Sequence, residues 1–480
     1  MAAPTANTIN DIRVNRGKIM NNQDKSNFKC SSWVALPLLA ILPLTGCLNS
    51  ETNQQPEVEQ TFAQDASKQE QKKVSENNNI DFGFIAFGDS GYHVDYLKEK
   101  QFVPLREDLA AFEKFETDEW LEDGKKLEEL VIPPSEFVPA VGGMIESSGM
   151  YPVANAMKSY CKDASCQFSV MLGDNIYPDG ATTGLDGKED SVRFDDLFSK
   201  PFGKMGEGLN DYRIYTALGN HDWKTSREGA MAQVDFMEST RPFYMDGLFY
   251  TVKPPAGNGD VEIFVIDTEV MLSGVTVMDT ELNPDGSEKK GMEVDSPDPH
   301  TMPANDGERN MVAWLDDKLK NSTAKWKFVI GHHPIWSVGG SKYEQARSLR
   351  ALILPSLCNY ADIYFAGHEH SLELHEDSCD AVFGKNSGKP ALLEVLSGAA
   401  AKQRSVNKGF KAYQTKTYPD NNTIYTKGMI WGFSHLQLTD DNAEITMHIT
   451  PNSGTGDTKL DFTYQYKRRS SLVSASAESK

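Results

Sequence analysis

Residues 82–91 have the sequence FGFIAFGDSG, in which an apolar run leads into Gly88-Asp89-Ser90-Gly91. A short apolar run bounded by glycine and polar residues predicts a buried strand that ends in a turn. Four other segments have the same form: FSVMLGDNIY (168–177), IYTALGNHD (214–222), FVIGH (328–332) and IYFAGHEH (363–370). We therefore predict five buried strands, each followed at once by polar side chains.

These polar side chains predict one shared site, because open α/β sheets bind ligands beyond the carboxyl ends of their strands. They are a set of carboxylate, amide, phenol and imidazole groups: Asp89, Asp174, Tyr177, Asn220, His332, His368 and His370. Oxygen and imidazole ligands suit hard or borderline metal ions. With one bridging carboxylate the set makes two groups of four ligands, which leaves room for water. Two metal ions about 3.5–4 Å apart can generate hydroxide and hold both ends of a phosphoryl displacement.

The five segments resemble those of the metallophosphoesterase (calcineurin-like) superfamily, and within it the purple acid phosphatases of the tartrate-resistant type. The similarity covers residues 82–398. It implies an α/β fold, the metallophosphoesterase four-layer sandwich of two mixed β-sheets flanked by helices. Many members have Asp-x-His where this chain has Asp89-Ser90-Gly91, and here Tyr177 follows Asp174 by three residues. Loss of that histidine and gain of a phenol is the purple acid phosphatase pattern.

The resemblance also assigns roles to individual residues. Fe(III) would be held by Asp89, Asp174, Tyr177 and His370. A second, divalent ion (iron, zinc or manganese) would be held by Asp174 as the bridge and by Asn220, His332 and His368. The implied enzyme is an acid phosphatase, a phosphoric monoester hydrolase in which a metal-bound hydroxide attacks phosphorus. His221 is the expected catalytic residue, which would stabilise charge and protonate the leaving alcohol.

Several alternatives stay open. Tartrate-resistant relatives have a second histidine where this chain has Ser341, so His221 alone, Lys342 or His333 would have to supply the proton or charge. Asp222 either orients His221 or caps a helix. The alternative enzyme is a phosphodiesterase or nucleotidase that uses the same metal site. The non-enzymatic alternative is a surface lipoprotein whose metal site serves in binding or adhesion.

The N-terminal residues predict export. An apolar stretch at 33–44 follows two lysines and is too short to span a bilayer. Its end, Leu44-Thr45-Gly46-Cys47, resembles a bacterial lipobox, which implies lipidation of Cys47. The alternative is a plain secretory signal. We expect a non-native extension at 1–19, a lipoprotein signal peptide at 20–46 and a flexible tether at 47–79. The protein would then be anchored in the bacterial envelope, in the outer membrane, facing the periplasm or the exterior.

The net charge limits the possible partners, and the cysteine content agrees with export. The formal net charge of −21 argues against a nucleic acid as partner, so we expect small phosphorylated substrates and a membrane reached through the lipid anchor. Four cysteines remain beyond the signal, and an even set pairs readily in an oxidising compartment. We favour the near-neighbour pairs Cys161–Cys166 and Cys358–Cys379 over a zinc cluster.

We expect one catalytic domain at 80–466, with insertions at about 93–150 and 270–309 and a disordered tail at 467–480. In relatives, a loop at the place of the second insertion represses the active site until it is cut; the alternative is a surface loop without that effect. Apolar spacing predicts helices at 105–115 and 310–320, and one at 343–354 that stops at Pro355. Further strands are expected at 262–266, 392–396, 436–438 and 445–449.

Overall fold

The computed structural model describes residues 79–97, 106–122, 125–139, 142–273, 299–339, 343–385, 387–452 and 455–469. The expected signal peptide, Cys47 and nearly all of the tether lie outside the described residues, as do Ser341, Lys342 and most of the second insertion. Among the described helices, none has both the length and the apolar character needed to cross a bilayer.

The first sheet contains three of the five predicted strands as a parallel set. These are β1 (Asp81–Phe87), β4 (Cys166–Leu172) and β5 (Ile214–Ala217), whose side chains are almost all buried, as expected for strands covered on both faces. The strand order is β16-β15-β14-β1-β4-β5-β6. The other members are β6 (Phe243–Tyr244), β14 (Trp431–Thr439), β15 (Asn442–Thr450) and β16 (Lys459–Lys467).

The second sheet contains the other two predicted strands, β9 (Trp326–Ile330) and β10 (Ile363–Ala366), which run parallel to each other. Its strand order is β13-β11-β12-β10-β9-β8-β7. The other members are β7 (Tyr250–Val252), β8 (Val261–Val265), β11 (Leu372–Asp377), β12 (Leu392–Ser397) and β13 (Asn421–Lys427). The additional strands predicted from the sequence therefore all exist, with shifted ends.

Aromatic rings fill the space between the two sheets. Phe84 of β1 stacks on Phe168 of β4 with ring centroids 4.5 Å apart. The Phe84 ring also lies 5.6 Å from that of Phe328 in β9 and 5.9 Å from that of Phe365 in β10. All four side chains are buried, and aromatic rings dominate the energetics of cores like this. The cluster fixes the two sheets against each other and so fixes the turns that follow these four strands.

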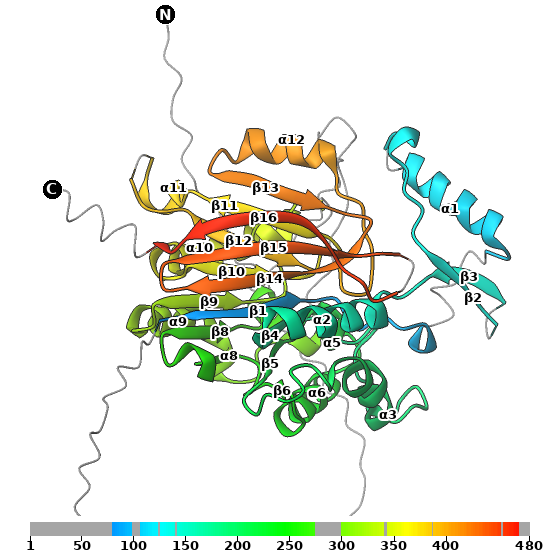
Figure 1. Ribbon diagram of the computed structural model, residues 1–480, viewed down its shortest axis with the longest axis horizontal. Helices are drawn as coiled ribbons and strands as arrows, with labels where there is room; N and C mark the ends of the chain where they lie inside the picture. The colour runs from blue at the N-terminus through cyan, green and yellow to red at the C-terminus, as the bar shows by residue number, and fades with distance from the viewer. Residues whose placement is uncertain are drawn as a thin grey trace, which may run out of the picture. The chain divides into compact units, whose positions relative to one another are not determined.

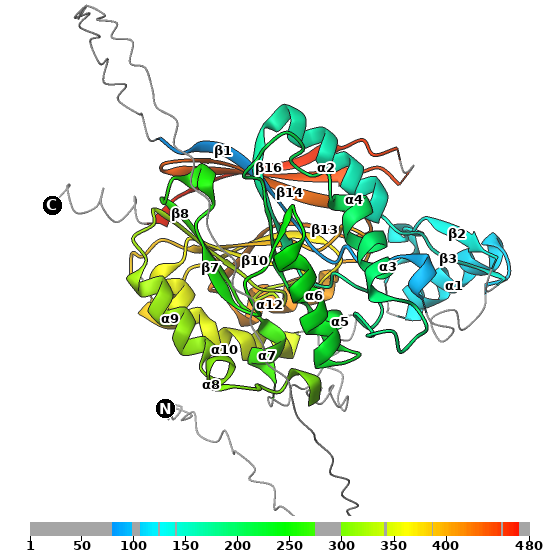
Figure 2. The same ribbon diagram turned by 90° about the horizontal axis from the view of Figure 1, so that it is seen from below.

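Helices cover the outer face of each sheet (Figures 1 and 2). Helix α2 (Met150–Ala164) packs on β1, β14 and β15, whereas α9 (Met311–Asn321) packs on β8 with α10 (Tyr343–Tyr360) beside it. The layers are helix, sheet, sheet and helix, which confirms the predicted fold class. The other helices of the two-sheet body are α3 (Asp190–Phe194), α4 (Lys200–Phe202), α5 (Asn220–Trp223), α6 (Arg227–Ser239), α7 (Thr268–Leu272), α8 (Asp306–Arg309), α11 (Asp380–Phe383) and α12 (Lys408–Thr417). Single turns are η1 (Val94–Tyr96), η4 (Asp195–Ser199), η5 (Pro255–Gly257) and η6 (Pro299–Thr301).

The first insertion has secondary structure of its own: α1 (Leu109–Glu122), η3 (Leu127–Glu129) and a hairpin of β2 (Ser135–Val138) and β3 (Gly143–Glu146). The helix predicted at 105–115 was placed too early. Asp108 accepts a hydrogen bond from the backbone N–H of Ala111, 2.8 Å away, and such a cap starts a helix after it.

Helix α10 also differs from its prediction. It continues through Pro355 to Tyr360, although proline removes a backbone hydrogen bond and normally ends or kinks a helix. The carbonyl of Pro355 accepts a hydrogen bond of 2.8 Å from the Asn359 side chain, and Leu357 and Cys358 in the following turn are buried. Tertiary packing therefore overrides the proline signal.

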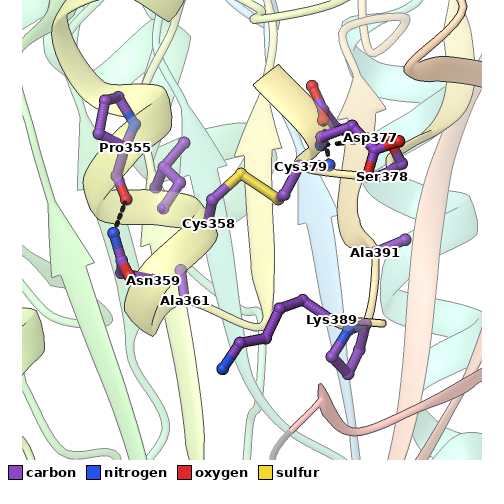
Figure 3. Close-up of a disulfide and its surroundings, with 12 residues drawn as sticks. Pro355, Cys358, Asn359, Ala361, Asp377, Ser378, Cys379, Lys389 and Ala391 are labelled. Atoms are coloured by element: carbon purple, nitrogen blue, oxygen red, sulfur yellow. Dashed lines mark hydrogen bonds between the residues drawn. A yellow bond between two sulfur atoms is a disulfide. The ribbon is translucent and has the colours of Figure 1, made fainter. Parts of the chain in front are cut away.

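The cysteines form the two favoured pairs rather than a zinc cluster. Cys161 in α2 is bonded to Cys166 at the start of β4, and Cys358 in α10 is bonded to Cys379 before α11 (Figure 3). The chain end beyond β16 is also anchored here, because the Arg469 guanidinium donates to the carbonyls of Leu357, Cys358, Ala361 and Pro390 at 2.5–3.2 Å. The predicted start of the tail at Lys467 is therefore too early.

Candidate metal centre

The five polar turns meet at one end of the two sheets. Those after β1, β4 and β5 come from the first sheet, and those after β9 and β10 come from the second. Six of the seven predicted ligands are buried, and Asn220 is partly exposed. The structure therefore brings together side chains that are up to 281 positions apart in the chain, from Asp89 to His370.

One group of ligands surrounds the phenol of Tyr177. Its hydroxyl lies 2.9 Å from Asp89 Oδ1, 2.8 Å from Asp174 Oδ2 and 3.2 Å from His370 Nε2. His370 Nε2 is also 3.5 Å from Asp89 Oδ1. Ligands that bind one ion at about 2.1 Å in a tetrahedral arrangement lie about 3–3.5 Å apart. These four groups match that spacing and would hold one metal ion.

A second group surrounds His332. Its Nε2 lies 3.3 Å from Asp174 Oδ1, 3.2 Å from Asn220 Oδ1 and 3.1 Å from His368 Nδ1. Asp174 thus turns one carboxylate oxygen to each group, as a bridging ligand must. The donor set of carboxylate, amide, phenol and imidazole fits a pair of hard or borderline metal ions.

The backbone at three ligands adopts an unusual conformation. Asp89, Asp174 and His368 have φ angles of 54°, 53° and 72°, in the left-handed region that residues other than glycine rarely enter. Such residues cost about 1–3 kcal/mol each and cluster at functional sites. This backbone conformation directs all three side chains toward the same site.

Glycine at position 91 is imposed by a close backbone approach. A Cβ at Gly91 would lie 2.0 Å from the carbonyl oxygen of Asn175, far inside contact distance. The histidine of the Asp-x-His pattern therefore has no room on this backbone. A Cβ at Gly219 would likewise meet the backbone nitrogen of Asp174 at 2.3 Å. Both glycines let the first three turns pack directly on one another.

The electrostatics of the site favour a bound cation. Burial, reinforced by the nearby carboxyl of Asp174, raises the pKa of Asp89 to about 7. Burial and the two carboxyls raise the pKa of the Tyr177 phenol well above its usual value. Burial alone would raise the pKa of Asp174, but the imidazole groups of His332 and His221 hold it well below its usual range. Metal ions would stabilise the ionised forms of all three ligands.

Asp222 fixes the turns that carry the ligands. Its carboxylate accepts hydrogen bonds from the backbone N–H groups of Asn175, Ile176 and Gly219 at 3.0, 3.0 and 2.8 Å. It therefore caps α5 and ties the second turn to the third, rather than binding the His221 ring. In the same way, His332 Nδ1 lies 2.8 Å from the Leu172 carbonyl, which directs Nε2 toward Asp174.

His221 lies beside the ligands at the partly exposed rim. Its backbone N–H donates to Asp174 Oδ1 at 2.8 Å, and its ring centroid is 4.2 Å from that of Tyr177. Nδ1 lies 2.5 Å from the carbonyl oxygen of Pro178, so Nδ1 carries the proton, and the Lys224 ammonium lies 3.1 Å from Nε2. His333 faces elsewhere, with its ring nitrogens 2.8 Å from Thr268 Oγ1 and 3.5 Å from Glu269 Oε2.

Three basic residues near the site were not predicted: Lys224, whose ammonium lies 3.0 Å from His221 Nδ1, and Lys402 and Arg404 in the loop after β12. The Lys402 ammonium lies 5.5 Å from the centre of the Tyr177 ring, and Arg404 pairs with the buried Glu369 at 2.6 Å. The loop begins at Ser397-Gly398 like the other five turns, but its charged residues come four or more positions later. A search for polar residues directly at strand ends therefore misses them.

Comparisons with known proteins find similar sequences and similar structures. Residues 146–372 match the calcineurin-like phosphoesterase family. Purple acid phosphatase 7 of Arabidopsis thaliana is 28% identical over 299 residues, which cover 61% of this chain and 75% of that protein. Two solved structures are more distant. The anchor protein of the Plasmodium inner membrane complex has a TM-score of 0.48 and 15% identity, covering 83% of this chain and 94% of its own. A purple acid phosphatase from yellow lupin seeds has a TM-score of 0.45 and 12% identity, covering 82% and 55%.

Proposed function

We propose that this chain, a member of the metallophosphoesterase superfamily and of the purple acid phosphatase type, is a binuclear-metal acid phosphatase acting on phosphate monoesters. The observation that carries the proposal is the position of Asp174. One of its oxygens lies 2.8 Å from the Tyr177 hydroxyl and the other 3.3 Å from His332 Nε2. A carboxylate shared between a phenol group and an imidazole group supports two different metal ions in one site.

The chemistry of the donors supports the assignment of the ions. Asp89, Asp174, Tyr177 and His370 would hold Fe(III), since a phenol between two carboxyls ionises only beside a strongly acidic cation. Asp174, Asn220, His332 and His368 would hold a divalent iron, zinc or manganese ion. When bound, the two ions supply hydroxide near neutral pH and neutralise charge on the phosphate.

The protein's own contribution to the reaction would come from His221. The Pro178 carbonyl and the Tyr177 ring fix its imidazole, so that Nε2 lies at the rim beside both ligand groups. When it is protonated at Nε2 as well, the imidazolium would donate a hydrogen bond from Nε2 to the substrate and hold the proton that the leaving alcohol takes.

The test is metal analysis, visible spectroscopy and hydrolysis by the purified full chain. We expect two metal ions per chain, a ferric–phenolate absorption band, and faster turnover of p-nitrophenyl phosphate than of bis(p-nitrophenyl) phosphate. Tyr177→Phe should abolish the band. Tyr92→Phe is the matched control, because that phenol is also buried but donates to the carbonyl of Glu146.

Each alternative has its own outcome. Faster turnover of the diester would identify a phosphodiesterase. A folded, metal-loaded protein without turnover would identify a binding protein. A colourless active protein with zinc or manganese alone would contradict the ferric assignment and leave hydrolysis intact.

We also propose that the enzyme is exported and attached to the bacterial envelope through a lipid on Cys47. The two disulfides of the described chain support export, since such bonds persist in oxidising compartments. Cys47→Ser should move the phosphatase from the membrane fraction to the soluble fraction with unchanged turnover. Retention of this variant in the membrane would contradict the anchor.

A further inference from the structure

We infer that Lys402 is a phosphate-binding residue of this site, whose ammonium group donates to a phosphate oxygen of the substrate. The inference rests on the proposed function and names a residue that none of the five ligand segments contains. It follows from the position of the ammonium, from the lack of any hydrogen bond or ion pair to it among the described residues, and from the charge of the ligand set.

The position of Lys402 is set by two aromatic rings. Its ammonium lies 5.5 Å from the centre of the Tyr177 ring and 5.0 Å from that of Tyr92. The two rings meet edge to face with centroids 6.5 Å apart. Cation–π contacts of this kind hold a charge in place and leave its N–H groups available as donors. The ammonium is therefore fixed beside a ligand of the metal centre.

The Lys402 ammonium forms no ion pair with a carboxylate of the described residues. Within the described part of the chain it takes part in no hydrogen bond and no ion pair, although the side chain is half-buried. Arg404, two residues later, differs: its guanidinium donates to Glu369 at 2.6 Å. The nearby Glu146 accepts a hydrogen bond of 3.0 Å from the backbone N–H of Gln403. Lys402 is thus a charge that faces the site without a structural partner ion.

The ligand set explains why a further cation is useful. Asp89, Asp174 and ionised Tyr177 carry three negative charges, which cancel much of the charge of a ferric and a divalent ion. A phosphate monoester brings a dianion into this space, and a buried charge is costly without compensation. Together with the hydroxide that the two ions would supply, the dianion exceeds the remaining positive charge by one, and Lys402 would supply the balancing charge and a donor.

The test compares three variants of the metal-loaded full chain. Lys402→Met removes the charge and keeps the length, Lys402→Arg keeps the charge, and Lys416→Met removes a charge from the exposed end of α12 as the matched control. Calorimetric titration with inorganic phosphate gives a readout that does not depend on turnover. The loss of a hydrogen bond to a charged group predicts phosphate binding about 10- to 100-fold weaker in Lys402→Met.

Lys402→Arg and Lys416→Met should bind phosphate within about threefold of the wild type. Lys402→Met should also lose more kcat/KM on the dianionic monoester than on the monoanionic diester, with unchanged metal content and absorption band. Equal phosphate affinity in Lys402→Met and Lys416→Met would overturn the inference. So would loss of metal from both Lys402 variants, because the residue would then support the centre itself. Wild-type protein that binds phosphate through Lys402 but hydrolyses no ester would instead refute the proposed function.

Discussion

Charged groups are buried at both ends of strands β9 and β10, and the groups that compensate these charges differ between the two ends. At the amino ends, Asp362 accepts backbone hydrogen bonds from Lys327 at 3.0 Å and Arg469 at 3.2 Å. The Arg469 guanidinium in turn donates to four carbonyl groups. At the carboxyl ends, Asp89 and Asp174 meet a phenol and imidazole groups, and among the described residues no lysine or arginine pairs with either carboxyl.

The difference distinguishes buried charges that stabilise the fold from buried charges that serve the chemistry of the site. At the amino ends folding alone supplies every partner, so this end should matter for stability and little for chemistry. At the carboxyl ends the carboxyls would be neutralised by metal ions bound from solution. Substitutions at this end should therefore lower turnover and have little effect on the stability of the metal-free protein. Four sets of substitutions test this contrast, and their expected effects decrease from the first to the last.

Asp89→Asn should lower phosphatase turnover by about 10³-fold or more, because it removes a charged ligand of the first ion. The metal-free variant should be at least as stable as the metal-free wild type at pH 7 and above. The reason is that burial raises the pKa of Asp89 to about 7, so ionised Asp89 opposes folding as the pH rises above its unfolded value of about 3.9. Turnover, metal content and thermal unfolding check this, and a less stable metal-free variant would contradict the contrast.

Arg469→Met should lower the free energy of unfolding by about 3 kcal/mol or more, since it removes the guanidinium donor of several buried carbonyl groups, among them those of Leu357, Cys358 and Ala361. Denaturant titration measures the loss, and turnover at low temperature should stay unchanged. Arg468→Met is the matched control. Its guanidinium pairs with the exposed carboxylate of Asp441 at 2.9 Å, a type of contact that contributes about 1 kcal/mol or less. Equal losses in the two variants would refute the special role of Arg469.

The double variant Cys358→Ala/Cys379→Ala should lose about 3 kcal/mol of stability, because the bond closes a separation of 21 residues. The pair Cys161→Ala/Cys166→Ala closes only 5 residues and should lose about 2 kcal/mol by the same chain-entropy argument. Metal content should not change in either. Loss of metal from Cys358→Ala/Cys379→Ala would show that the amino and carboxyl ends of the strands are coupled through β10.

His435→Phe tests a buried group that the fold keeps neutral. Burial, with a contribution from His448, lowers the pKa of His435 to about 4. Between pH 6.5 and 4 the unfolded chain therefore binds a proton that the native protein does not, and the stability of the wild type falls as the pH falls through this window. The variant should lose about 2 kcal/mol less than the wild type between about pH 7 and 5. Parallel stability curves would contradict this assignment.

The sequence predicts the ligand set better than it predicts the surroundings of the ligands. All five segments form strands whose following turns meet at one site. They could be predicted because the burial of each strand and the polarity of each turn depend on neighbouring residues in the sequence. The passage of α10 through Pro355 depends on packing around Leu357 and Cys358, and the site of Lys402 depends on how two sheets meet. Neither can be read from one segment. The sequence predicts that His221 belongs to the site, and its ring lies beside that of Tyr177, whereas the role of Asp222 needed the geometry of two turns.

The close approach at Gly91 also has an evolutionary consequence. A side chain there would collide with the backbone of the neighbouring turn, at 2.0 Å from the Asn175 carbonyl oxygen. No single codon change can therefore return an imidazole to this position while the turn after β4 keeps its path. The exchange of a histidine for the phenol of Tyr177 would require at least two coordinated steps to reverse. Descendants of this sequence are accordingly expected to vary their substrates and loops before they vary this ligand.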